Sequence, residues 1–118
     1  MIDPADIVKK VFDGLEDDAV QALLAVADNK THPTGTVLCR EGQLEFSFYI
    51  IVDGLVAITQ RLTDGGTRHL TSRGPADFFG EMALIENKPR AATVVTTMET
   101  TVLEISERDF NQLLRRNP

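Results

Sequence analysis

The 118-residue sequence contains one cysteine, two histidines and no run of 18 apolar residues. A single cysteine, Cys39, cannot form an internal disulfide, which is typical of the reducing cytosol. The isolated His32 and His69 are too few for a multi-histidine metal site. Without a long apolar run there is no candidate membrane span, and the acidic start, residues 1–6, has no signal-peptide core. These absences favour a cytoplasmic domain that carries no metal or cofactor.

Positive charge is also scarce, because 12 Lys and Arg stand against 18 Asp and Glu and give a net charge of −6. This balance argues against a domain that itself grips a nucleic acid backbone. It is compatible with a small phosphorylated ligand, since one well-placed arginine can dominate locally. The length suits a single domain with a modest core, and there is no internal repeat or low-complexity segment.

The hydrophobic pattern changes near residue 34. Before it, apolar residues recur at helical spacing, which predicts a helical part over 1–33 that breaks near Asp13-Gly14 and ends at Pro33. After it, short β-type runs alternate with turn signals. The expected strands are 36–40, 48–52, 55–62, 67–71, 93–97 and 101–105. With Ser106 as the N-cap of a last helix over 107–116, the pattern predicts a mainly β fold with flanking helices, a small sandwich or jelly roll.

The most informative segment is residues 79–93. Gly80 lets the backbone approach a ligand closely, and the carboxylate of Glu81 accepts hydrogen bonds from sugar hydroxyls. Nine residues after Glu81, Arg90 supplies a planar cation that matches phosphate oxygens. The small side chains of Ala91-Ala92 leave backbone N–H groups accessible to an anion. Together these residues predict a site for a phosphorylated ribose.

The order Phe79-Gly80-Glu81-Met82-Ala83-Leu84-Ile85, followed by Pro89-Arg90-Ala91-Ala92-Thr93, resembles the phosphate-binding cassette of the cyclic nucleotide-binding domain family. Residues 48–56 and 74–78 are similar to that family's central hairpin and to the segment leading into the cassette. The resemblance implies an eight-stranded β-roll in one domain over 1–118. Its parts would be a helical 1–33, a β-roll over 34–105 with the cassette at 79–93, and the start of a C-terminal helical part at 106–118.

The family usually continues into a longer C-terminal helix where this chain ends, so we expect the chain to be a piece of a larger protein. The resemblance also implies the ligand contacts. Glu81 would hold the ribose 2′-hydroxyl with Gly80 against the sugar, while Arg90 and the Ala83 amide would hold the phosphate. A short helix over 83–87 would present its N-terminal N–H groups to that phosphate.

Other cassette residues are expected to combine a place in the site with a role in packing. Phe79, Met82 and Ala92 complete the expected ligand-binding set by their position. Five apolar residues in or next to this segment are expected in the core: Phe78, Phe79, Met82, Leu84 and Ile85. Ala91 stands where family members that prefer cyclic GMP often carry threonine, which favours cyclic AMP. Tyr49 is expected to pack with its hydroxyl at a surface partner, and Cys39 as a small buried hydrophobe.

Simpler interpretations stay open for the two charged residues. Arg90 is also compatible with a surface ion pair to Glu81 or Glu86, and Glu81 with a carboxylate at a helix start. The sequence departs from the family at Phe46, which replaces a usual Asp and removes a turn-stabilising carboxylate. Ala76 departs as well, because glycine is common there.

The leading prediction is a non-catalytic regulatory module that binds a 3′,5′-cyclic nucleotide, cAMP favoured over cGMP. Occupancy would pass through the helices, including an apolar face at Leu103, Phe110, Leu113 and Leu114, to an effector domain in the same or another chain. No direct contact with nucleic acid or membrane is expected, and a homodimer is left open. The alternatives are an interaction domain that kept the fold without the ligand, a cupin-type metalloenzyme on a similar roll, and DNA binding through a further helical domain.

Overall fold

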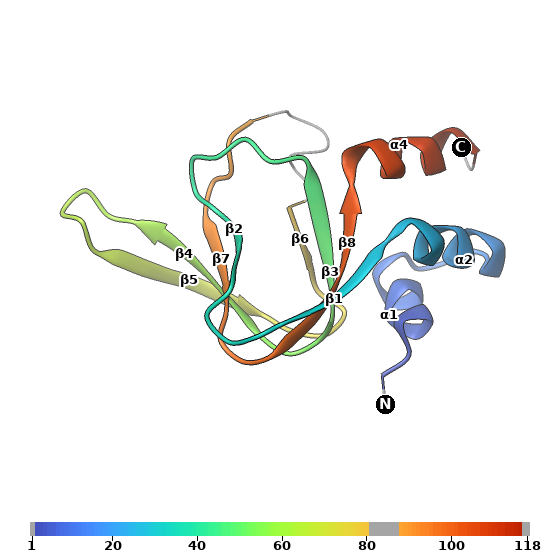
Figure 1. The fold of residues 1–118 in the computed structure, drawn as a ribbon, viewed down its shortest axis with the longest axis horizontal. Helices are drawn as coiled ribbons and strands as arrows, with labels where there is room; N and C mark the ends of the chain where they lie inside the picture. Colours follow the sequence, from blue (N-terminus) through green and yellow to red (C-terminus); the bar gives the residue numbers. More distant parts are fainter. Residues whose placement is uncertain (1, 81–87, 117–118) are drawn as a thin grey trace.

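The computed structural model describes residues 2–80 and 88–116. In this part of the chain, eight strands form two four-stranded antiparallel sheets, with orders β1-β8-β3-β6 and β2-β7-β4-β5. The helices gather beside the first sheet, and the β4–β5 hairpin extends from the opposite side (Figure 1). The mainly β fold with flanking helices is therefore confirmed. The strands are β1 (Asp28–His32), β2 (Val37–Cys39), β3 (Ser47–Asp53), β4 (Val56–Arg61), β5 (Thr67–Arg73), β6 (Phe78–Phe79), β7 (Thr93–Thr96) and β8 (Thr100–Ser106).

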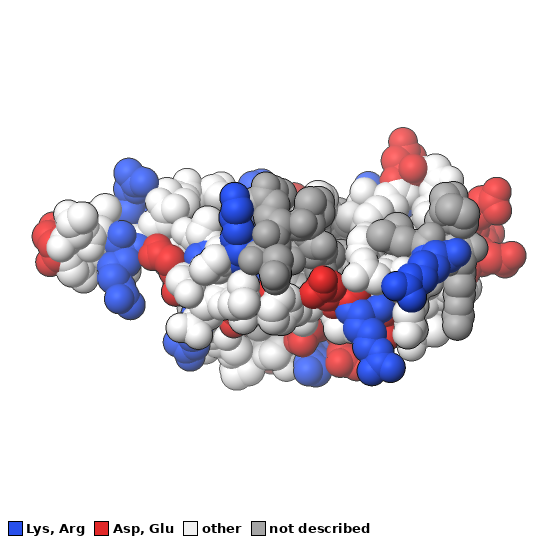
Figure 2. Space-filling model, turned by 90° about the horizontal axis from the view of Figure 1, so that it is seen from above, with Lys and Arg blue, Asp and Glu red and all other residues white. Residues whose placement is uncertain are grey.

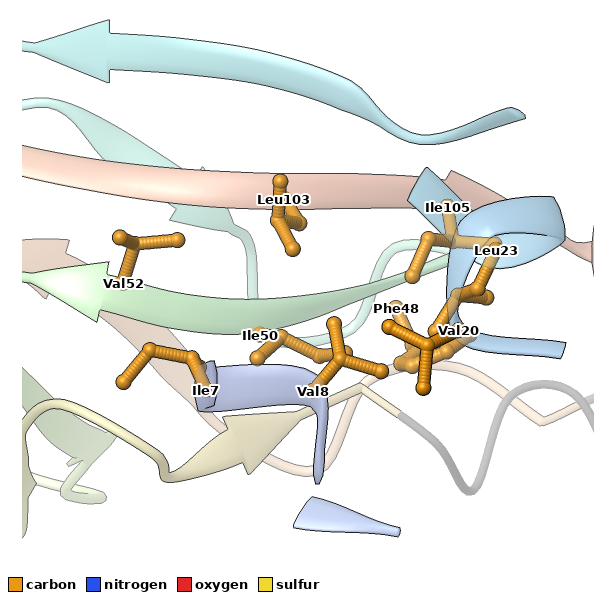
Figure 3. Packing of buried hydrophobic residues seen from close by; sticks show 9 residues of the cluster. All are labelled: Ile7, Val8, Val20, Leu23, Phe48, Ile50, Val52, Leu103 and Ile105. Atoms are coloured by element: carbon orange, nitrogen blue, oxygen red, sulfur yellow. The ribbon is translucent and has the colours of Figure 1, made fainter. Parts of the chain in front are cut away.

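Strand β3 belongs to both hydrophobic cores, because successive side chains of a strand point to opposite faces. On one face its residues pack under the helices α1 (Pro4–Val11) and α2 (Asp17–Val26) (Figure 3). That cluster consists of Ile7, Val8, Val20, Leu23, Phe48, Ile50, Val52, Leu103 and Ile105. On the other face Tyr49 and Ile51 join the interior of the roll with Leu38, Cys39, Val56, Phe79, Val94 and Val102.

The two N-terminal helices begin and end where local chemistry allows. Asp3 caps α1, since its Oδ1 accepts the N–H of Ala5 at 3.0 Å. Between α1 and α2 the chain turns at Gly14, whose φ is +84°, in the left-handed region that glycine tolerates. The break predicted near Asp13-Gly14 is confirmed.

The C-terminal helix α4 (Glu107–Arg116) has the predicted range. The hydroxyl of Ser106 accepts the N–H of Asp109 at 3.1 Å, as expected of an N-cap. The rings of Phe110 and Phe48 pack edge to face with centroids 5.1 Å apart, which joins α4 to the helix-side core. The N–H of Glu107 also donates to the carbonyl of Phe46 at 2.8 Å, so the first residue of α4 is bonded to the turn before β3.

Two expectations about the elements were wrong. The helical part predicted as 1–33 ends at Val26, and Asp28–His32 forms strand β1, paired with β8. These residues are polar and mostly exposed, so no apolar periodicity marks the strand. Phe78, expected in the core, is 44% exposed while Phe79 is 5% exposed, because the two residues of β6 face opposite sides. The helix expected over 83–87 lies outside the described residues.

Among the described residues, neither the helices nor the charges on the face in Figure 2 mark a further kind of site. No helix among the described residues is long and apolar enough to cross a membrane. On the face shown in Figure 2, acidic and basic side chains of the described residues lie interspersed.

Candidate functional site

Arg90 is the buried cation of the candidate site. Its side chain is 7% exposed, and its Nε donates to the Glu45 carboxylate at 3.2 Å. Nη1 donates to the carbonyl of Gly80 at 2.8 Å, and Nη2 to the carbonyl of Ser47 at 2.5 Å. Because Arg90 is buried, its interpretation as a surface residue is wrong. Its described acidic partner is Glu45, and the partners expected in that interpretation, Glu81 and Glu86, lie outside the described residues. A guanidinium has five N–H groups, so two remain for an anion beyond these three contacts to described residues.

Gly80 is shaped for a close contact. Its φ is +87°, and a Cβ there would lie 2.8 Å from Nη1 of Arg90 and 3.0 Å from the carbonyl oxygen of Ser47. Both the backbone angle and the space exclude a larger side chain. The sequence predicted that a ligand approaches this glycine; in the described structure the group that approaches it is the guanidinium of Arg90.

An aromatic pair supports this glycine from inside the roll. The ring of Phe79 stacks on Tyr49 with centroids 4.9 Å apart, and the hydroxyl of Tyr49 donates to the carbonyl of Leu38 at 3.3 Å. The expected surface partner for that hydroxyl was wrong, because Tyr49 is buried. Burial is the main cause that raises the pKa of the Tyr49 hydroxyl, so it remains a hydrogen-bond donor.

Cys39 lies in the same interior and is 2% exposed. Burial raises the pKa of its thiol to about 12, and the nearby charge of Arg90 opposes that shift only in part. The prediction of a small buried hydrophobe is confirmed.

The loop over residues 40–45 holds the backbone of Arg90 from the other side. The N–H of Gly42 donates to the carbonyl of Arg90 at 2.8 Å, and the N–H of Arg90 donates to the carbonyl of Gln43 at 2.8 Å. Within the same loop, the N–H of Arg40 donates to Glu45 at 3.3 Å. The departure at Phe46 was expected to remove a stabilising carboxylate from this turn; Glu45, one residue earlier, supplies one.

The residues after Arg90 are bonded to strand β4. The side-chain amide of Gln60 donates to the carbonyl of Ala91 at 3.0 Å and accepts from Arg68 at 3.2 Å. Ala91 is exposed and Ala92 is half-buried. The segment that begins at Arg90 is thus held by both a loop and a strand, while its small side chains leave the backbone open.

The structure brings together only some of the predicted site residues. Phe79, Gly80 and Arg90 meet, and Ala91-Ala92 follow directly. Three predicted contacts lie outside the described residues and stay predictions: Glu81, Met82 and Ala83. The sequence interpretation missed Glu45, Ser47 and Gln60. For Glu45 the sequence did contain a signal, because this carboxylate stands one position before Phe46, where the family usually has an Asp.

Two four-stranded antiparallel sheets with flanking helices place this protein in the class of β-roll domains, and its buried arginine lies behind a glycine turn. Residues 29–117 match the model of the family described as the cyclic nucleotide-binding domain. Because the match spans most of the sequence, the chain belongs to the cyclic nucleotide-binding domain family. The match includes the whole cassette and, apart from Asp28, both sheets.

Relatives of several kinds share the domain. A cAMP-dependent protein kinase regulatory subunit of Dictyostelium discoideum is 42% identical over 70% of this chain and 28% of its own length. A cyclic AMP receptor protein of Thermus thermophilus is 30% identical over 92% of this chain and 50% of its own length. The chain thus spans half or less of the length of these relatives. A solved structure of the regulatory domain of Toxoplasma gondii PKA with cAMP superposes with a TM-score of 0.85 at 29% identity, covering 93% of this chain and 42% of that one.

Proposed function

We propose that this chain is a non-catalytic regulatory module that binds a 3′,5′-cyclic nucleotide and relays its occupancy to an effector. The carrying observation is the burial of Arg90, at 8% exposure, at the cassette position. A buried guanidinium is costly unless an anion pairs with it. Its described anionic partner, Glu45, has a side chain that is 32% exposed. A phosphodiester in the site would complete the pairing from the ligand side.

The favoured ligand is cAMP, with cGMP second. Ala91 offers no hydroxyl to a guanine amino group, and the names of the relatives refer to cAMP. Glu81 is proposed to hold the ribose 2′-hydroxyl. No cofactor and no catalytic step are part of this proposal, and the domain is placed in the cytoplasm.

A short chain of contacts supports a relay to the C-terminal helix. Arg90 bonds to Glu45 and Ser47, which flank Phe46. The carbonyl of Phe46 in turn accepts the N–H of Glu107, the first residue of α4. A ligand that draws Arg90 toward itself would change its bonds on both sides of Phe46. A ligand shifts a conformational equilibrium only by its differential affinity for the two states. The two states proposed here are two positions of α4, and this helix leads to an effector in the same or another chain.

Calorimetric titration with cAMP and cGMP, on the wild type and on Arg90→Ala, tests the binding. We expect cAMP to bind more tightly than cGMP. Truncating one partner of a buried charge pair costs about 2–5 kcal/mol, so Arg90→Ala should weaken binding by roughly thirtyfold or more. Arg90→Lys should restore little, because an ammonium cannot make the paired planar contact.

Circular dichroism on the same samples serves as the control for folding. A folded Arg90→Ala protein that binds cAMP within about threefold of the wild type, under 1 kcal/mol, would defeat the assignment of the site. If the wild type binds neither nucleotide, the second candidate gains, an interaction domain that kept the fold without the ligand. The Arg90–Glu45 pair is the observation that favours it, because the cation already has an internal anion.

A further inference from the structure

Gln60 connects the segment after Arg90 to the β4–β5 hairpin. Its Nε2 donates to the carbonyl of Ala91 at 3.0 Å, and its Oε1 accepts from Nη2 of Arg68 at 3.2 Å. A guanidinium can only donate hydrogen bonds, so Arg68 fixes the end of the amide that carries the oxygen. The NH2 end must then face Ala91. Both ends of the side-chain amide are bonded, which gives it one orientation.

The contact also sets the direction of a backbone N–H group. A peptide group is planar and trans, so its C=O and N–H point in opposite directions. Because Gln60 draws the Ala91 carbonyl toward β4, the N–H of Ala92 in the same peptide group points away from β4. Gly42 orients the preceding peptide group similarly, since its N–H donates to the carbonyl of Arg90 at 2.8 Å.

These two N–H groups lie beside a buried cation. No hydrogen bond from the N–H of Ala91 or of Ala92 to another described residue is present, and both residues retain solvent exposure. They directly follow Arg90, which is 8% exposed. Successive backbone N–H groups next to a guanidinium suit the oxygens of a phosphate.

We propose that Gln60 is a positioning residue for the ligand's phosphodiester: by holding the Ala91 carbonyl, it directs the Ala92 N–H to a phosphate oxygen, with Arg68 orienting the Gln60 amide. Gln60 touches no ligand in this arrangement and acts through the backbone. The inference rests on the proposed function, because it assumes that the anion at Arg90 belongs to a cyclic nucleotide.

The first test compares side chains of matched length. Gln60→Met keeps the length of the side chain and removes its donor and acceptor, and we expect about three- to tenfold weaker cAMP binding, the loss typical of one hydrogen bond. Gln60→Glu can still accept from Arg68 but cannot donate to Ala91, so it should bind at least as weakly. Gln21→Met is the matched control, because Gln21 is an exposed residue of α2 and takes no part in the contacts of Arg90 or Ala91; it should bind like the wild type.

The second test separates positioning from a general loss of structure. The two phosphorothioate diastereomers of cAMP each replace one exocyclic phosphate oxygen by sulfur, a weaker hydrogen-bond acceptor. In Gln60→Met, sulfur at the oxygen that faces Ala92 should reduce affinity by a smaller factor than in the wild type. Sulfur at the other oxygen should reduce affinity by the same factor in both proteins.

Each outcome decides one of the two proposals. Suppose that the wild type binds cAMP and that Gln60→Met binds it within 1.5-fold of the wild type. Gln60 then has no positioning role, and the proposed function stands. The same conclusion follows if Gln60→Met, relative to the wild type, loses the same factor of affinity for both diastereomers. If the wild type binds neither cAMP nor cGMP, both are wrong. Should Gln60→Met fail to fold, Arg68→Met carries the same diastereomer comparison, with a smaller expected effect because the bond to Ala91 persists.

Discussion

At the scale of single residues, the partners of Arg90 differ in charge. The carbonyls of Gly80 and Ser47 orient the guanidinium without neutralising it, whereas the Glu45 carboxylate does neutralise it. Since the Glu45 side chain is 32% exposed, it can exchange this partner for water. Although two N–H groups of Arg90 remain for an anion, we expect Glu45 and an anionic ligand to compete for its positive charge.

Glu45→Gln should strengthen cAMP binding by roughly two- to fivefold, because a partly exposed ion pair is worth up to about 1 kcal/mol. The glutamine amide oxygen can still accept from Arg90 and from the N–H of Arg40, so the turn should keep its shape. Calorimetric titration measures the change. Glu41→Gln is the control from the same loop, because the Glu41 carboxylate accepts the N–H of Arg61 and does not contact Arg90 among the described residues. Weaker binding by Glu45→Gln would show that Glu45 organises the site and does not compete for it.

Gly80→Ala should destabilise the fold more than the same change at Gly65. Both glycines have a left-handed φ, +87° and +91°, but a Cβ at Gly65 meets nothing within 4 Å. The backbone alone costs about 1–2 kcal/mol. At Gly80 the contacts with Arg90 and Ser47 add to that cost and should also weaken cAMP binding.

Urea unfolding of both variants, with titration of cAMP, measures this difference. Equal losses of unfolding free energy at the two positions would mean that Arg90 and Ser47 yield to the extra methyl group.

At the scale of elements, the strands that have a clear hydrophobic pattern could be predicted from the sequence. Contacts between residues far apart in the chain could not. Strands such as β3 and β8 were predictable because their buried residues form distinct runs. Strand β1 was not, since its polar residues are held by backbone pairing to β8 and by the Thr31–Thr101 hydroxyl contact of 2.8 Å. The site divides in the same way.

Gly80 and Arg90 belong to one local motif and could be predicted. The contacts of Glu45 and Gln60 could not be predicted, because each joins residues far apart in the sequence. Glu45 and Arg90 are separated by 45 positions, and Gln60 and Ala91 by 31. No local pattern records such a pairing. The carboxylate expected from the family also moved by one position, so a comparison of motifs alone predicted its loss.

Glu107→Pro should break the proposed link between the site and α4 while keeping the helix. Proline is tolerated at the first residue of a helix, and Ser106 before it already has the extended backbone of a strand. The substitution removes the N–H that donates to the carbonyl of Phe46. Glu107→Ala is the matched control, because it loses the same side chain and keeps that N–H.

Hydrogen exchange of the α4 amides, with and without cAMP, is the measurement. The wild type and Glu107→Ala should show a change of protection on binding, and Glu107→Pro a smaller one. Equal responses in the two variants would exclude this hydrogen bond as the link.

At the scale of the whole molecule, the two hydrophobic cores share strand β3. Loss of either core removes half of the packing of that strand, so we expect the described part of the chain to unfold as one unit. Stabilisation at the site should then appear in the melting temperature of the whole domain.

Saturating cAMP should raise the melting temperature. A ligand at 100 times its Kd that binds only the native state adds about 2.7 kcal/mol, which corresponds to roughly 10 °C for a domain of this size. Adenosine 5′-monophosphate, which lacks the cyclic diester, is the control and should shift the melting temperature less. Flat melting curves with millimolar cAMP and cGMP would contradict the proposed function.

Cys39 makes the chain well suited to site-specific labelling. With 2% exposure and a pKa of about 12, its thiol offers little thiolate to maleimides at neutral pH. A cysteine introduced at the exposed Gln112 of α4 would then be the one position that reacts in the native protein. A fluorophore there, paired with a fluorescent nucleotide, would report the distance between ligand and helix by energy transfer without removal of the natural cysteine.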